Sequence, residues 1–139
     1  MTMPAGKYYV GDLCYVMHER WDEFCDITIN DHKCLSGEFV MSDGTRFATY
    51  GTKWGDGSYL DDSHRQYSVD AGLIGCVLID DLDLEADGNS TRGGQVIEFK
   101  KPFETYSKDG LIYFGEDVCV DTDPSFNEGD DDYALEEEF

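Results

Sequence analysis

Apolar and polar residues alternate in short runs up to about Val120, and turn residues separate the runs. Glu38–Met41 and Arg46–Tyr50 both alternate in this way on either side of Ser42–Thr45. The Asp43-Gly44 pair at the centre of that segment tolerates the positive φ angles of tight turns. The pattern therefore predicts a β-hairpin over residues 38–50.

A second hairpin is predicted further along the chain, where Phe103–Tyr106 and Leu111–Phe114 flank the turn segment 107–110. We expect Gln95–Phe99 to add a strand before it. Leu73–Ile79 is a continuous apolar run rich in β-branched residues, which is typical of a strand covered on both faces. This run is predicted to lie at the centre of the fold.

One segment has helical rather than strand spacing. Apolar or small residues recur at intervals of three and four between positions 17 and 28, and charged residues fall between them. The recurring residues are Met17, Trp21, Phe24, Cys25 and Thr28. The spacing predicts one amphipathic helix of two to three turns that lies over the sheet.

These elements predict a mainly β (α+β) fold. With roughly seven or eight short strands joined by Gly-rich turns, a strongly bent antiparallel sheet or a small barrel is the expected frame. The acidic residues gather after position 115. We therefore divide the chain into a β-rich globular domain at 1–115 and a disordered acidic tail at 116–139.

Charge sets the strongest limit on function. The 139 residues include 31 Asp and Glu against 10 Lys and Arg, which gives a formal net charge of -21. Eleven of the acids lie in 116–139, where there is no Lys or Arg, so the tail carries -11 and the rest of the chain -10. Such a field repels nucleic-acid backbones and anionic membranes and attracts basic proteins. We expect no direct nucleic-acid or membrane binding.

The expected cellular compartment follows from two features that the sequence lacks. It contains no apolar stretch of the roughly 20 residues that a membrane helix needs, and residues 1–6 lack the pattern of a signal peptide. A cytosolic location is expected. The chain has five cysteines, which are odd in number, scattered along the sequence and without a Cys-x-x-Cys pair. We therefore expect reduced thiols. They are Cys14, Cys25, Cys34, Cys76 and Cys119.

An acidic loop at residues 80–88 invites comparison with a calcium site. Asp83, Glu85, Asp87 and Gly88 would match positions 1, 3, 5 and 6 of an EF-hand loop. The match fails at position 12, where Gly94 stands in place of a bidentate Glu. No EF-hand is predicted, and weak divalent-cation binding by the loop stays open as an alternative.

A zinc site is not predicted either. Structural zinc ligands come in pairs two to four residues apart, and here only Cys14 with His18 and the looser His32 with Cys34 approach that spacing. Cys25 would have to complete the set from a distance. We expect no bound metal and no cofactor.

Catalytic signatures are also missing from the sequence. It has no Gly-x-Ser-x-Gly elbow, no phosphate-binding glycine loop and no His-Glu-x-x-His pair. Cys14 or Cys25 with His18 would form a nucleophile and base only in an electropositive setting, and this chain is acidic. We predict no enzyme activity, with a small enzyme kept as an alternative.

Three runs of residues carry a resemblance to known sequences. They are Gly11–Val16 with its Gly-Asp-x-Cys-Tyr-Val order, Trp21–Cys25 and Tyr67–Gly75. Over residues 6–80 the chain resembles a group of small uncharacterised proteins of bacteriophages and bacteria. The resemblance implies a phage or bacterial source and brings no activity with it.

The acidic tail is similar to the C-terminal tails of bacterial and phage single-stranded-DNA-binding proteins, which are acidic, end in Phe and dock on partner proteins. Carboxylates of such a tail would steer it toward a basic patch, and an apolar side chain would anchor it there. The predicted partner-binding residues are Asp130, Asp131, Asp132, Tyr133, Leu135, Glu136, Glu137, Glu138 and Phe139. A tail that only solubilises the protein is the alternative.

Together these features predict a non-enzymatic acidic interaction protein, encoded by a phage, that binds a basic surface on a nucleic-acid-processing host protein. In its strongest form the protein inhibits that partner as a nucleic-acid mimic, with carboxylates in place of phosphates. A virion structural or decoration protein is the main alternative. The sequence does not predict the partner's identity or the oligomeric state.

Overall fold

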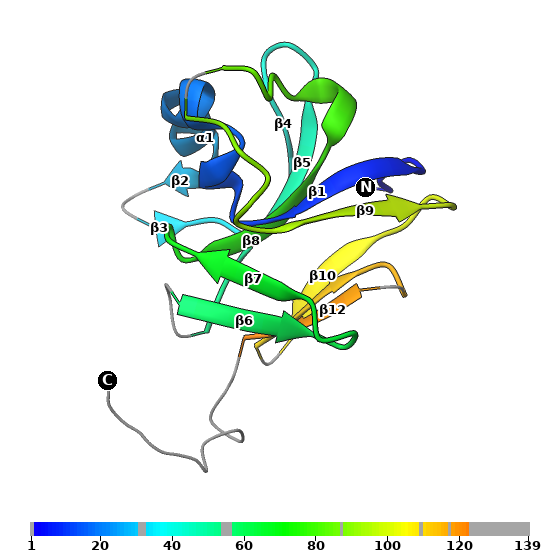
Figure 1. The fold of residues 1–139 in the computed structure, drawn as a ribbon. Helices are drawn as coiled ribbons and strands as arrows, with labels where there is room; N and C mark the ends of the chain where they lie inside the picture. Colours follow the sequence, from blue (N-terminus) through cyan, green and yellow to red (C-terminus); the bar gives the residue numbers. More distant parts are fainter. Residues whose placement is uncertain are drawn as a thin grey trace.

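The structure is a computed structural model that describes residues 2–30, 33–53, 57–86, 88–108, 110–116 and 118–122. Within these residues the chain forms two five-stranded antiparallel sheets, a two-stranded hairpin and one α-helix (Figure 1). The two large sheets pack face to face, and the helix lies on the far side of the first sheet. This arrangement confirms the mainly β fold class with one short helix.

The first sheet has the strand order β4-β5-β8-β1-β9. Its strands are β1 (Gly6–Gly11), β4 (Gly37–Val40), β5 (Arg46–Gly51), β8 (Leu73–Leu78) and β9 (Gln95–Phe99). β8 lies at the centre, as predicted, because it pairs with both β5 and β1. Gly75 allows this close packing, since a Cβ atom there would lie 2.1 Å from the Ala48 carbonyl oxygen.

The second sheet has the order β10-β11-β12-β6-β7. Its strands are β6 (Gly57–Asp61), β7 (Gln66–Val69), β10 (Thr105–Lys108), β11 (Leu111–Phe114) and β12 (Val118–Asp121). Both predicted hairpins are present, as β4 with β5 and as β10 with β11. Ser107 and Lys108, expected in the turn, belong to β10, since Lys108 pairs directly with Leu111.

Two strands lie elsewhere than the sequence suggested. β9 does not join the hairpin that follows it but pairs with β1 in the first sheet. β12 falls in the stretch assigned to the acidic tail, yet it pairs with β11 and β6. Val118 and Val120 are buried, and their alternation makes β12 part of the core. The folded chain thus continues to Thr122, beyond the boundary expected at residue 115.

The predicted helix is present but begins later than its spacing suggested. Two 3₁₀ turns, η1 (Leu13–Tyr15) and η2 (His18–Arg20), precede α1 (Trp21–Thr28). Phe24 stacks on Phe47 of β5 with ring centroids 5.0 Å apart, so α1 covers the first sheet. A hairpin of β2 (Ile29–Asn30) and β3 (Lys33–Cys34) follows. In the described part of the chain, every helix is too short or too polar to cross a membrane.

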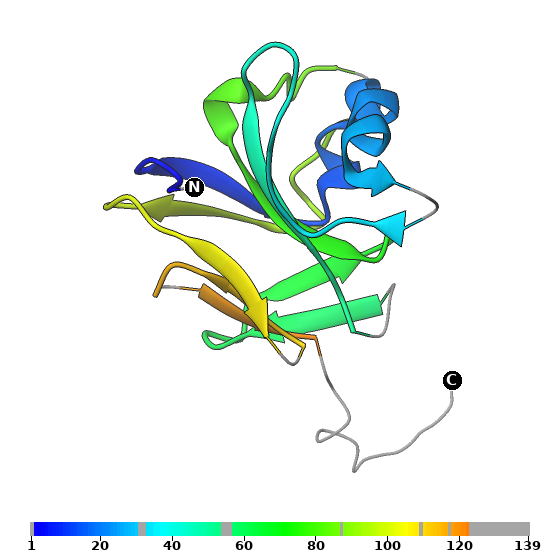
Figure 2. The same ribbon diagram turned by 180° about the vertical axis from the view of Figure 1, so that it is seen from behind.

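Apolar side chains form two cores on the two sides of the first sheet. Tyr8 and Val10 of β1 point between the two sheets, whereas the intervening Tyr9 points toward α1. The two large sheets stay open and separate (Figure 2). Side chains link them at one corner, where Tyr50 Oη lies 2.8 Å from Thr105 Oγ1, and Thr105 Oγ1 lies 3.0 Å from Glu38 Oε2 of β4.

Candidate functional site

Acidic side chains from three separate segments meet at one end of the molecule. η2 and α1 supply four of them, the β4–β5 turn supplies one, and the connection between β8 and β9, which begins with the 3₁₀ turn η3 (Ile79–Asp81), supplies four. We name this set the acidic end. Its members are Glu19, Asp22, Glu23, Asp26, Asp43, Asp80, Asp81, Asp83 and Glu85.

Arg20 ties the three segments together. Its Nη1 donates to Asp43 Oδ2 at 2.9 Å, in the β4–β5 turn. Its Nη2 donates to the Asp81 carbonyl oxygen at 2.9 Å, in η3. The Arg20 side chain is only 17% exposed, so a largely buried charge holds the Asp43 carboxylate and the Asp81 backbone in place.

Asn89 makes a second link between η2 and the β8–β9 connection. Its Nδ2 donates to Glu19 Oε1 at 2.8 Å and to the Asp83 carbonyl oxygen at 2.7 Å. Its Oδ1 accepts the His18 backbone N–H at 2.9 Å. Gly88 has φ +91°, and a Cβ there would lie 2.4 Å from His18 Cδ2, so this contact requires glycine. The connection is thereby fixed against the helix.

Two carboxylates of the acidic end are fixed by hydrogen bonds. Hydrogen bonds from Ser42 to Glu23, one of them from the Ser42 N–H at 2.8 Å, lower the pKa of Glu23 below its usual value. Hydrogen bonds from Thr45 likewise lower the pKa of Asp43. Both groups are therefore ionised at neutral pH. The set carries nine formal negative charges around the charge of Arg20.

Asp12, in the Gly-Asp-x-Cys-Tyr run, has a structural role. It is fully buried, and its carboxylate accepts backbone N–H groups from Cys14 at 3.0 Å, Asp70 at 2.7 Å and Ala71 at 2.6 Å. Tyr9 Oη also donates to the Asp12 carbonyl oxygen. The side chain thus joins the start of η1 to the turn between β7 and β8.

The structure argues against a thiolate nucleophile at Cys14. Burial raises the pKa of the Cys14 thiol, and the neighbouring negative charge of Asp12 raises it further. The thiol therefore stays protonated at neutral pH, and a protonated thiol is a poor nucleophile. A Cys14–His18 pair gains no support from this environment.

In the described part of the chain, no three His, Cys, Asp or Glu side chains lie close enough together to hold a metal ion. Asp83 instead uses its Oδ1 to accept the Glu85 backbone N–H. Three residues considered for metal sites, His32, Asp87 and the side chain of Cys34, lie outside the described residues. So do all the predicted partner-binding residues from 130 to 139.

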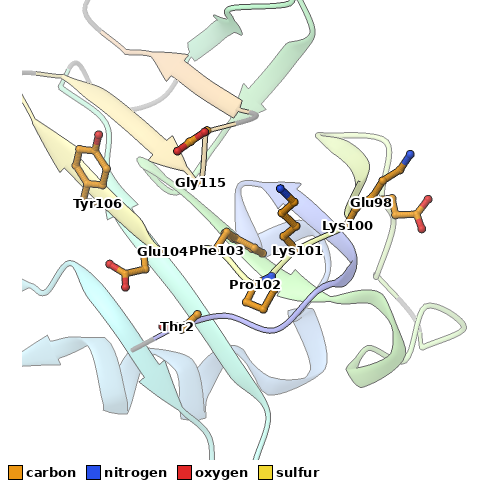
Figure 3. Close-up of a pocket in the computed structure, with 10 residues that line it drawn as sticks. Thr2, Glu98, Lys100, Lys101, Pro102, Phe103, Glu104, Tyr106 and Gly115 are labelled. Atoms are coloured by element: carbon orange, nitrogen blue, oxygen red, sulfur yellow. The ribbon is translucent and has the colours of Figure 1, made fainter.

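A groove of about 890 Å³ opens between the sheets beside the β9–β10 connection. In Figure 3, Phe103 and Lys101 lie at its middle, while Glu104 and Tyr106 line one side. Lys100 and the carboxylates of Glu98 and Glu116 complete a lining of mixed charge. These charged residues are exposed, so the groove lacks the buried polar anchors of a specific ligand site.

Comparison of the chain with family models, with curated proteins and with solved structures gives no significant match. Function is therefore inferred from the molecule's own surfaces. At the acidic end, specific contacts of Arg20 and Asn89 hold together segments that are far apart in the sequence.

Proposed function

We propose that this chain is a non-enzymatic acidic interaction protein that binds a basic surface of a partner protein through the acidic end. The observation that carries the proposal is that Arg20 and Asn89 join three segments at one end of the molecule, and these segments together carry nine acidic residues. The proposal moves the main contact from the acidic tail, where the sequence suggested it, to the folded domain.

The physical advantage of this arrangement is that the charges are already in place. A disordered acidic segment loses conformational entropy when it binds, whereas carboxylates on a rigid surface lose little. Clustered charge also steers a basic partner over long range and speeds encounter at low salt. Binding should therefore be fast and should weaken as salt is added.

In its finer form, the proposal identifies the partner as a nucleic-acid-processing host protein and the chain as a phage-encoded inhibitor in the host cytoplasm. The carboxylates would then occupy positions that phosphates take in the partner's natural complex. Residues 130–139 would add a second, weaker contact. Duplex DNA or RNA should compete with the chain for the same partner if this form holds.

Two variants of equal charge test the proposal. Five exposed acids are neutralised in each, so both differ from the native chain by the same formal charge. The acidic-end variant carries Asp22→Asn, Asp26→Asn, Asp80→Asn, Asp83→Asn and Glu85→Gln. The control variant carries Asp62→Asn, Asp70→Asn, Glu98→Gln, Glu104→Gln and Glu116→Gln.

The native chain and both variants are immobilised and exposed to bacterial lysate at about 0.05 M and at about 0.5 M salt. The Debye length is roughly 14 Å at the lower concentration and roughly 4 Å at the higher one. We expect a basic protein to bind the native chain and the control variant at low salt and to be lost from the acidic-end variant. Equal retention by the two variants would refute the acidic end as the contact.

A further inference from the structure

The outer face of the second sheet is uncovered by the other described elements (Figures 1 and 2). Alternate residues of its strands, such as Ile112, Val118 and Tyr67, are buried between the sheets, so their neighbours point outward. We call this surface the bare face. Its members are Ser58, Leu60, Gln66, Ser68, Tyr106, Lys108, Leu111, Tyr113, Cys119 and Asp121.

Large apolar side chains remain in contact with solvent on the bare face. Tyr106 is 51% exposed and Leu60 is 48% exposed. Tyr106 also stacks on Tyr113, with ring centroids 4.4 Å apart and an interplanar angle of 14°. Leu60 lies apart from this pair on β6, and partly exposed aromatic groups that adjoin, as Tyr106 and Tyr113 do, mark protein contact surfaces.

The bare face differs from the rest of the molecule in its charge balance. Lys108 and Asp121 are the charged members of the set, so it is formally neutral although the chain carries -21. Lys108 pairs in register with Leu111, and Leu111 pairs with Asp121 on its other side. The two opposite charges therefore flank Leu111, one strand away on each side.

We propose that the bare face binds a second copy of this chain in a symmetric dimer. A two-fold axis along β11 would place Leu111 on Leu111 and Tyr113 on Tyr113 of the other copy. It would also bring Lys108 of each copy opposite Asp121 of the other, because the two residues lie at equal distances on either side of β11. The charges thus complement each other twice in one interface.

The size of the bare face makes this dimer weak. Five strands of about four residues cover roughly 24 Å by 14 Å, well below the roughly 800 Å² per partner of a stable interface. Association should therefore depend strongly on protein concentration. The acidic ends lie on the first-sheet side of each copy, so both stay accessible in the dimer.

The dependence on salt distinguishes dimerisation through the bare face from partner binding through the acidic end. Two chains of charge -21 repel each other, and added salt screens that repulsion while leaving apolar burial intact. Self-association should therefore increase with salt, whereas binding of a basic partner should decrease. The two proposals can then fail independently.

The test is analytical ultracentrifugation of the full chain from about 10 μM to about 1 mM, the range in which small interfaces associate. We expect a monomer–dimer equilibrium that shifts toward dimer at high salt. Lys108→Asp should weaken it by about tenfold, because it sets like charges opposite each other. Lys108→Asp combined with Asp121→Lys should restore it, and Lys100→Asp should leave it unchanged.

Thermal melting of each variant shows whether it remains folded, which the exposure of Lys108 leads us to expect. A native chain that stays monomeric at the highest concentration would overturn the proposal. So would a Lys108→Asp variant that dimerises as well as the native chain, or a double variant that fails to recover.

Discussion

The outer faces of the two sheets differ in what covers them. On the first sheet, α1, the two 3₁₀ turns and the β8–β9 connection lie over Tyr9, Phe47 and Val77, which are fully buried. On the second sheet, the matching positions are taken mostly by polar residues such as Ser58, Gln66 and Ser68, with Leu60 and Tyr106 exposed among them. An apolar outer face must be buried under other elements, while a polar one stays stable in water.

The elements that cover the first sheet also form most of the acidic end. The elements that bury the first sheet carry acids on their solvent side, and packing brings those acids together at the acidic end. No comparable gathering of charge occurs on the bare face. The covered side therefore provides a fixed acidic surface, and the uncovered side provides a nearly neutral one.

The largest effect on stability should come from removing the Asp12 carboxylate, which joins the start of η1 to the turn between β7 and β8. Asp12→Ala leaves three backbone N–H groups without their acceptor inside the protein, which should lower the free energy of unfolding by about 4–5 kcal/mol. Urea denaturation followed by circular dichroism measures this loss. Asp70→Ala, at an exposed neighbouring position, should change stability by less than about 0.5 kcal/mol.

The packing of the helix can be tested next. Phe24 is buried between Trp21 and Phe47, and Phe24→Ala should cost about 3–4 kcal/mol because it opens a cavity under α1. The same denaturation experiment applies. The variant should also lose affinity for a basic partner, since α1 positions three acids of the acidic end. Full affinity in a destabilised but folded variant would show that α1 is not part of the contact.

The second sheet has its own buried carboxylate, Asp61. Burial alone would raise the pKa of Asp61, but hydrogen bonds from Tyr67 and from the Arg65 and Ser63 backbone, together with the Arg65 guanidinium, lower it below its usual value. Tyr67 Oη and Arg65 Nε each lie 2.7 Å from Asp61 Oδ2. The ionised form is thus favoured in the folded state.

A lowered pKa in the folded state gives a definite sign to the pH dependence. The contribution of Asp61 is complete above the pKa of an unfolded Asp, about 3.9, and is lost as the pH falls through the lower folded pKa. Asp61→Asn should therefore lower stability at pH 7 and flatten the loss of stability below about pH 4. An unchanged acid-denaturation slope would contradict the assignment.

A smaller effect on stability than that of Phe24→Ala is expected at the bare face. Tyr106 is already half exposed, so Tyr106→Ala should cost no more than about 1 kcal/mol despite the loss of its stack on Tyr113. Thermal melting at low protein concentration measures this without interference from dimerisation. A loss as large as that of Phe24→Ala would mean that the bare face is structurally essential.

The elements that the sequence predicted correctly depend on local signals. The hairpin at 38–50 follows from the Asp43-Gly44 turn, where Gly44 has φ +94°, and α1 follows from its spacing. The pairing of β9 with β1 and of β12 with β6 depends on contacts between distant segments, whereas β12 pairs with the adjacent β11 and shows a local alternation at Val118 and Val120. No local pattern encodes the contacts between distant segments.

The candidate site was harder to foresee for the same reason. The acids of η2 and α1 and those of 80–85 are visible in the sequence, but their meeting depends on Arg20 and Asn89 reaching across the fold. The buried role of Asp12 likewise depends on Asp70 and Ala71, far along the chain.

The most direct test of the central claim is a hydrogen-exchange footprint of the full chain, free and bound to the basic partner that it captures. Slower exchange should appear in α1, in the β4–β5 turn and at residues 79–89, with the bare face unchanged. Protection confined to residues 123–139, to the groove or to the bare face would contradict the account.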